Sequence, residues 1–498
     1  YLTDPPKGKT GVTITISSAL TNGANIGVTL AQGHSETIAT GANNNDLQYF
    51  HSDGSYSFVL DSDNIKLSNG TTPTPQAHEH PICGKTCSHT DNDKHTNVVS
   101  WVGVSNLDSI MAGTAENPNY YYLTNNVTIT TATEAPALDS SVSSWKMYYG
   151  WDAPDNVVLC LNGYDITMEN PAEYTSKNVD VIRITGNFTL TDCQSAQGKI
   201  THTAQSKGRG AYVLGGTFNM YGGQITRNTT QQYSGGGGVC IGGIQDTNRS
   251  SVFNLYGGSI THNTAGIGGG VKVSRIVWYG PSQFNMYGGS ITDNTATVTD
   301  ETPNSYGVGG GVYVSWTATC KMSGGTITGN TAKFDGAGVY LSALARSYEN
   351  DNGKAAKFEI FGSPSITGNT VNDKTSNVCL ESHTADNNFE TVDSSITISR
   401  ALSSGANIGV TLAQGHRGTI ATGAISSDLQ YFHSDGDYLF RLDGNNIKLS
   451  NGTTHEHIHD WKYVVDGATI TATCNNTDNN CTSPNGGSIT ISAPTNLT

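Results

Sequence analysis

The chain has 498 residues, 59 of them glycine, and only 13% of its residues are charged, with a formal net charge of −15 at pH 7. This acidic balance argues against a nucleic-acid partner, because neutralising phosphates requires clustered lysine and arginine. The sequence has no apolar run long enough to span a membrane, so we expect no membrane insertion. Short runs of valine, isoleucine, phenylalanine and tyrosine recur throughout, which predicts a folded rather than a disordered chain.

The chain opens with a segment that returns near its other end. Residues 14–71 align without a gap with residues 396–453, and 45 of the 58 positions are identical. We therefore expect residues 1–72 to be the closing element of a preceding repeat module, and residues 396–454 to close the module between them. The sequence then predicts an excerpt from a tandem array, in which neighbouring modules are partners of one another.

Residues 73–97 are expected to form a linker rich in histidine and cysteine. Zinc takes four nitrogen or sulfur ligands, and pairs spaced by two to four residues suit one site. The two linker cysteines with two of the histidines could complete such a site. The candidate ligands are His78, His80, Cys83, Cys87 and His89. The alternative is a Cys83–Cys87 disulfide, which suits a protein outside the cell.

The strongest internal repeat lies between residues 156 and 395, after an expected entry or cap region at 98–155. Its motif reads Phe-Asn-Met-Tyr-Gly-Gly-x-Ile-Thr-x-Asn in the clearest copies. The five copies begin at Phe218, Phe253, Phe284, Cys320 and Phe358. Their closing asparagines lie 35, 31, 36 and 39 residues apart, and each copy is followed by a third short apolar stretch.

Each unit therefore holds three short stretches of period-2 alternation, separated by Gly-Gly and Asn-Thr corners. No helical apolar period lies between them, so no helix is available for a βαβ crossover. We predict an all-β fold, namely a parallel β-helix with three short strands per coil and small flanking β modules. The phenylalanine positions should stack in an inward column, and the closing asparagines should form a hydrogen-bonded column at a corner.

One outward column carries residue types that can perform catalysis. Arg227, His262 and Asp293 occupy the position before the closing asparagine on successive coils. Acid or base chemistry needs such groups clustered on one exposed face. The position varies between coils, and no paired carboxylates flank it. The alternative interpretation is therefore a solvated corner position without a catalytic role.

A second outward column, on the third strand, carries aromatic residues. Tyr313 and Tyr340 lie on neighbouring coils, and Trp278 and Trp316 lie in or beside nearby loops. Aromatic rings on a flat parallel face can stack on sugar rings. These four residues are the candidate ligand-binding residues, and the alternative is that tyrosine simply suits exposed strands.

The chain resembles the right-handed parallel β-helix surface proteins of Gram-positive gut bacteria of the Clostridia type. The residues that carry this resemblance are Tyr120–Thr124, Val158–Gly163, Leu190–Cys193, the Gly-Gly-Ser-Ile-Thr-x-Asn-Thr-Ala units and the His/Cys linkers. The repeat units are also similar to those of polymorphic outer-membrane adhesins. The resemblance implies a right-handed β-helix and an extracellular location, secreted or attached to the cell wall. It implies no catalytic residues.

Within this resemblance, residues 455–498 look like a linker followed by the start of a small immunoglobulin-like β-sandwich. Cys474 and Cys481 would enclose a short loop there, and we expect a disulfide between them.

These features favour a non-enzymatic structural or adhesive module of a cell-surface tandem-repeat protein that contacts host or glycan surfaces. One alternative is a β-helix polysaccharide lyase or glycoside hydrolase, which would need acids such as Asp293, Asp335 or Glu349 to converge at the insertion loops. Another is a binder of one specific host protein. No cofactor is expected beyond zinc at the linker.

Overall fold

The computed structural model falls into two compact units, Tyr1–Trp101 and Val102–Thr498. The structure describes residues 14–17, 20, 26–28, 37–42, 46, 50–52, 58–67, 78–79, 86–87, 101–135, 146–242, 249–274, 281–299, 306–315, 317–344, 354–383, 392–413, 416, 418–450, 461–466, 469–474 and 488–492. These residues form an all-β fold with short 3-10 turns and no α-helix. Accordingly, this part of the chain contains no helix that could span a membrane.

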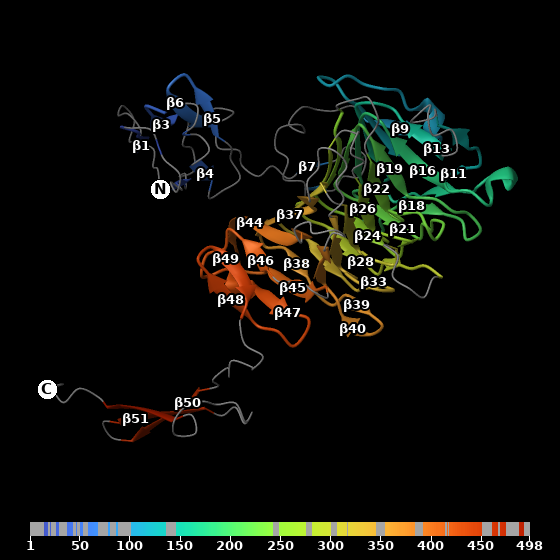
Figure 1. The fold of residues 1–498 in the computed structure, drawn as a ribbon. Helices are drawn as coiled ribbons and strands as arrows, with labels where there is room; N and C mark the ends of the chain where they lie inside the picture. The colour runs from blue at the N-terminus through green and yellow to red at the C-terminus, as the bar shows by residue number, and fades with distance from the viewer. Residues whose placement is uncertain are drawn as a thin grey trace, which may run out of the picture. The chain divides into compact units, whose positions relative to one another are not determined.

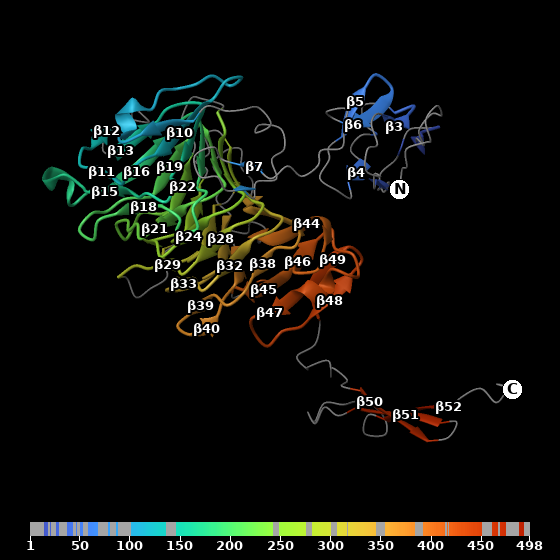
Figure 2. The same ribbon diagram turned by 180° about the vertical axis from the view of Figure 1, so that it is seen from behind.

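The first strands of successive units form one long, mainly parallel sheet of 13 strands. Figure 1 labels β9 near one end of this sheet and β37, β44 and β46 toward the other, and Figure 2 shows β44, β46 and β49 side by side. In sheet order they are β9 (Val102–Val104), β10 (Asn119–Leu123), β14 (Val157–Cys160), β17 (Asn187–Thr191), β20 (Thr217–Met220), β23 (Ser251–Leu255), β27 (Ser282–Met286), β31 (Thr319–Met322), β37 (Lys357–Gly362), β44 (Ser395–Leu402), β46 (Thr419–Thr422), β49 (Asn446–Leu449) and β48 (Phe440–Asp443).

The second and third strands of the units form a sheet of 19 strands, in which two ladders run side by side. The second-strand ladder is β11 (Val127–Ile129), β15 (Ile166–Met168), β18 (Lys199–His202), β21 (Gln224–Thr226), β24 (Ser259–Thr261), β28 (Ser290–Thr292), β32 (Thr326–Thr328), β38 (Ser365–Ile366) and β45 (Asn407–Leu412). The third-strand ladder is β13 (Tyr148–Ala153), β16 (Val179–Ile184), β19 (Ala211–Leu214), β22 (Val239–Gly242), β26 (Val271–Val273), β30 (Val312–Val314), β34 (Val339–Leu341) and β41 (Val378–Leu380), which also pairs with β45. The antiparallel β12 (Thr133–Glu134) joins at one end, and β47 (Phe432–Ser434) pairs with β45 at the other.

The pairing between units is in register, which is what a repeating coil requires. Phe218 pairs with Phe253, and Phe253 with Phe284, while the second and third strands repeat the same pattern. The chain thus returns to each sheet once per unit, an arrangement compatible with a parallel β-helix. The expected entry region at 98–155 contributes β9 to β13 to the same two sheets.

The core is a set of stacked side-chain columns, and the predicted phenylalanine column is confirmed. Its rings stack with centroid distances of 5.8, 4.9 and 5.2 Å from Phe188 through Phe218 and Phe253 to Phe284. Cys320 takes the next place in this column and is 2% exposed. Burial raises the pKa of its thiol, so it acts as a small apolar core residue.

The predicted asparagine column is also confirmed, as an unbroken ladder of buried side chains. Each amide donates from Nδ2 to Oδ1 of the next member over 2.8–3.0 Å. The members are Asn228, Asn263, Asn294, Asn330, Asn369 and Asn377. Each Oδ1 that accepts in this way also takes the preceding member's backbone N–H, at 3.0–3.1 Å, which fixes the orientation of the amide. The ladder begins at His202 and ends on the Asp435 carboxylate.

We expect Asn294→Ala to lower the free energy of unfolding by about 2–3 kcal/mol, because it leaves a buried donor unsatisfied. The backbone N–H of Asn263 donates to Asn294 Oδ1 and would lose this acceptor. Asn219→Ala is the matched control, since Asn219 and the Asn254 amide that donates to it are both half-buried in an outward amide column of the same coils. Urea unfolding followed by circular dichroism should give a clearly smaller loss for the control. Equal losses would show that the ladder adds nothing beyond an ordinary amide contact.

Four units carry a short strand that the three-strand expectation lacks. It follows the asparagine corner and forms a separate five-stranded sheet of β25 (Thr264–Ala265), β29 (Thr295–Ala296), β33 (Thr331–Ala332), β39 (Thr370–Val371) and β40 (Lys374–Thr375). The reason is the ladder itself. The asparagines stack in register, so the backbone N–H of the residue after each asparagine reaches the backbone carbonyl of the asparagine one unit earlier. Thr295, for example, donates to the Asn263 carbonyl at 2.8 Å.

The two copies of the long-range repeat adopt the same strand pairings. In the first copy, the strands are β1 (Ile14–Thr15), β2 (Ile26–Val28), β3 (Thr37–Thr40), β4 (Phe50–Ser52), β5 (Phe58–Asp61) and β6 (Asn64–Leu67). The pairing of Ile14 with Ala39 matches that of Ile396 with Ala421, and both copies carry a register shift at the same place. In the second copy, β44 and β45 continue the two long sheets, so this copy is the end of the stacked coils.

The segment after residue 460 forms a three-stranded antiparallel sheet of β50 (Trp461–Asp466), β51 (Thr469–Cys474) and β52 (Ser488–Ser492). These strands lie where the small β module was expected. Cys474 ends β51, but its side chain and Cys481 lie outside what the structure describes, so the disulfide stays a prediction.

Candidate functional site

The candidate catalytic column lies at a corner with left-handed backbone. Arg227, His262 and Asp293 are exposed, and each has a φ of +56°. Gly329 and Gly368 hold the same place in later units, with φ of +68° and +69°. Glycine is favoured in this conformation, which explains its appearance in the column. The turn directs the following asparagine into the ladder, and a catalytic role for the column stays a prediction.

Tyr313 and Tyr340 stack on each other, with ring centroids 5.8 Å apart and planes 6° from parallel. Both are half-buried, because a glycine-rich turn packs against the base of each side chain, at Gly309 and Gly336. Burial raises the pKa of Tyr313 to about 12. These rings therefore offer less free face than an exposed column would. The other two predicted binding residues, Trp278 and Trp316, lie outside the described residues.

The predicted zinc ligands fall on a short hairpin of the first unit. Its strands are β7 (His78–Glu79) and β8 (Thr86–Cys87), and their register sets His78 opposite Cys87. The ligand side chains, with His80, Cys83 and His89, lie outside the described residues, so zinc and the disulfide both stay open. Among the side chains that the structure does describe, no group of three or more His, Cys, Asp or Glu residues could hold a metal ion.

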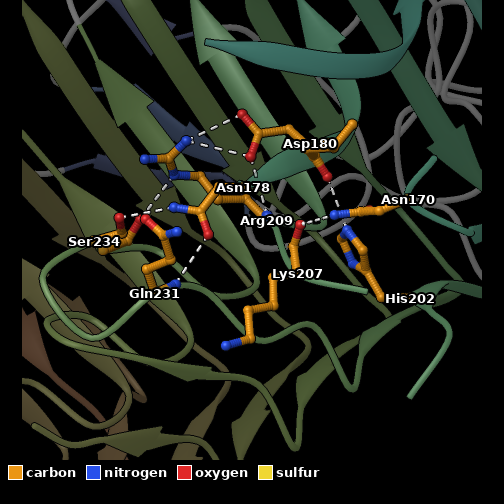
Figure 3. A network of polar contacts seen from close by, with 10 residues as sticks. Asn170, Asn178, Asp180, His202, Lys207, Arg209, Gln231 and Ser234 are labelled. Carbon is orange, nitrogen blue, oxygen red and sulfur yellow. Dashed lines mark hydrogen bonds and ion pairs between the residues drawn. The ribbon is translucent and has the colours of Figure 1, made fainter. Parts of the chain in front are cut away.

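A buried polar network lies at the start of the asparagine ladder (Figure 3). Asp180 and Arg209 form an ion pair at 3.1 Å, and the carboxylate also accepts the backbone N–H of Arg209 at 3.0 Å. His202 lies nearby, with Nδ1 2.7 Å from Asn228 Oδ1 and Nε2 2.8 Å from the Val179 carbonyl. Burial lowers the pKa of His202, and these two contacts oppose that shift. Asp180, Arg209 and His202 all contact other protein groups, so we assign these three residues to stability.

An aromatic ladder lies at the border of the outer face of the 13-stranded sheet, where β20, β23 and β27 end, and the sequence analysis did not identify it. Tyr221, Tyr256 and Tyr287 stack with centroid distances of 4.5 and 4.8 Å and planes 5° and 11° from parallel. Tyr256 is 38% exposed and Tyr287 44% exposed. We call these three residues the tyrosine ladder. Their rings repeat at the strand spacing of the sheet and present ordered apolar surface to solvent.

A column of outward amides lies beside the tyrosine ladder, two residues earlier on each strand. Asn254 donates to Asn219 and Asn285 donates to Asn254, each over 2.8 Å between Nδ2 and Oδ1. These bonds hold the amides at the same repeat as the rings. Asn219 and Asn254 are half-buried, whereas Asn285 is buried. The face therefore combines stacking rings with two ordered amides, which is the pairing of chemistries that binds sugars.

The tyrosine ladder ends at a small pocket of about 220 Å³. Its lining residues are Met286, Tyr287, Lys321, Ser323, Glu359, Phe361 and Arg400. Lys321 and Glu359 form an ion pair at 2.9 Å, and the Arg400 guanidinium lies 3.8 Å from the ring centre of Phe361. Burial would raise the pKa of Glu359, but Lys321, Ser399 and Arg400 together lower it, so this carboxylate is ionised.

The signal for this face was present in the sequence. In the motif Phe-Asn-Met-Tyr, strand alternation sends phenylalanine and methionine inward and therefore asparagine and tyrosine outward.

Comparisons of the chain with protein-family models, with curated proteins and with solved structures found no match.

Proposed function

We propose that this chain is a right-handed parallel β-helix module of a secreted or wall-attached tandem-repeat protein, and that it binds glycans without cleaving them. The observation that carries the proposal is the tyrosine ladder. Its rings are parallel and evenly spaced, those of Tyr256 and Tyr287 are exposed, and the core side of the sheet is fully packed. Such a surface is set before binding, so little conformational entropy is lost when a glycan chain lies along it.

The repeated closing element supports a modular arrangement. Its second copy caps the coils through β44 and β45, and its first copy has the same internal pairings. We propose that the first copy closes a neighbouring module in the same way, through β1 and β2. In this arrangement the coils act as a rigid spacer and carry the binding face.

We expect Tyr256→Ala to weaken glycan binding about tenfold, because the central ring of the tyrosine ladder is lost. Retention on a glycan array and titration calorimetry with the best-bound oligosaccharide measure the effect. Tyr233→Ala is the matched control, since Tyr233 is 51% exposed but lies at a corner between β21 and β22. Unchanged binding by Tyr256→Ala, or an equal loss in the control, would contradict the proposed face.

A further inference from the structure

The column that holds the tyrosine ladder has one position without a ring. Strand register continues the column from Tyr287 to Ser323 and then to Phe361. Neighbouring strands in a sheet lie about 4.8 Å apart, so Tyr287 and Phe361 are separated by about two such spacings. Tyr287 stacks on Tyr256 with one face, which leaves its other face toward the Ser323 coil. The pocket of about 220 Å³ occupies this place.

Phe361 and Arg400 both line the pocket. Arg400 comes from β44, which pairs with β37 on the side opposite β31, and its guanidinium lies 3.8 Å from the centre of the Phe361 ring. The pocket therefore has an aromatic ring and a cationic group side by side at this end. A pocket of this size is smaller than the roughly 300–1,000 Å³ of typical small-molecule sites, so it suits a single substituted ring.

Charged residues first occur on this face at the coil of Ser323, the position of the column that lacks a ring. The outward column beside the rings reads Asn219, Asn254 and Asn285, and then changes to Lys321 and Glu359. With Arg400, the pocket carries two cationic groups and one carboxylate, hence one net positive charge in a chain whose formal net charge is −15. The cations can hold an anion, while Glu359 and the Ser323 hydroxyl can accept or donate hydrogen bonds to ring hydroxyls.

From this geometry we infer that the Ser323 pocket binds one anionic six-membered sugar ring, stacked between Tyr287 and Phe361 with its carboxylate or sulfate against Arg400 and Lys321. This inference rests on the proposed function and gives it a ligand class. The tyrosine ladder supplies stacking along a glycan, and the pocket selects the charged residue within it.

The test replaces Ser323 with tyrosine, the residue that precedes it in the column at Tyr287, so that a ring fills the pocket. We expect Ser323→Tyr to lower affinity for trigalacturonate, sialyllactose and a keratan sulfate oligosaccharide, which carries sulfate but no carboxylate, about tenfold, with the affinity for neutral cellohexaose unchanged. Arg400→Gln should give the same selective loss. Lys357→Gln is the charge control, because Lys357 is exposed on the same strand, β37, and does not line the pocket. Titration calorimetry on the full chain measures each affinity, and the carboxylated and sulfated probes separate the two sources of anion.

The outcomes distinguish this inference from the proposed function. If Tyr256→Ala weakens binding but Ser323→Tyr and Arg400→Gln do not, the glycan-binding face stands and the pocket inference is overturned. An equal loss for Lys357→Gln and Arg400→Gln would also overturn it, since only general charge would then matter. If no oligosaccharide binds the wild-type chain, the proposed function and the inference both fail.

Discussion

Replacing Phe253 by alanine is expected to lower the free energy of unfolding by about 3–5 kcal/mol. The Phe253 ring is fully buried and stacks on Phe218 at 4.9 Å and on Phe284 at 5.2 Å. Its removal would leave a cavity between two neighbours whose own positions are fixed by the sheet, so the core cannot collapse around it. Chemical unfolding monitored by circular dichroism and by tryptophan fluorescence measures the loss.

Tyr256→Ala is the control for this substitution, because it removes an aromatic ring from the same coil but from the outer face. Tyr256 is 38% exposed, and its loss should cost about 1 kcal/mol or less. Phe253→Leu, which retains most of the apolar volume, should fall between the two. A loss for Phe253→Ala no larger than that for Tyr256→Ala would contradict the account of the core.

The second large effect is expected for Asp180→Ala, which should cost about 3–5 kcal/mol because it leaves a buried guanidinium unpaired. The side chains of Asp180 and Arg209 are only 4% and 16% exposed. Burial would lower the pKa of Arg209, but the Asp180 carboxylate raises it, so the arginine is charged in the folded state. Figure 3 shows that this pair lies beside the groups that start the asparagine ladder. Thermal and urea unfolding measure the loss.

Asp152→Ala is the matched control, since Asp152 pairs with Arg183 but is 40% exposed. Both arginine side chains are 16% exposed, so the pairs differ in the carboxylate: water can take the place of the exposed Asp152 carboxylate, and the expected cost is about 1 kcal/mol or less. The double variant Asp180→Ala with Arg209→Met should recover much of the loss, because no charge then stays buried. If Asp152→Ala costs as much as Asp180→Ala, burial is not the source of the effect.

The parts of the fold that were predicted correctly are those set by the repeat. A fixed period places Phe253 and Phe284 at equal positions, and stacking follows once the strands pair in register. The same reasoning gave the corner asparagines. It did not predict the two-residue strand β25, because two residues show no alternation pattern. The pairing of this strand depends on the alignment of the backbone beside the asparagine ladder.

The binding face was harder to predict, for reasons that concern single residues. Tyr313 alternates outward on its strand, yet Gly309, with a φ of +70°, folds a turn against it, and no pattern in the sequence reports that contact. Tyr256 alternates outward as well and is 38% exposed. Telling these two columns apart requires the path of the loops. Likewise, Arg400 reaches Phe361 because of a register shift between β37 and β44, which alternation alone would not indicate.

The central claim is that the outer face of the 13-stranded sheet binds glycans and performs no chemistry on them. The most direct measurement incubates the purified chain with pectins, glycosaminoglycans, mucin glycans and plant hemicelluloses, and records both retention and new reducing or unsaturated ends. We predict retention that falls in Tyr256→Ala, with no product above a heat-treated control. Product from any of these substrates would contradict the account and direct attention to the acids near the insertion loops.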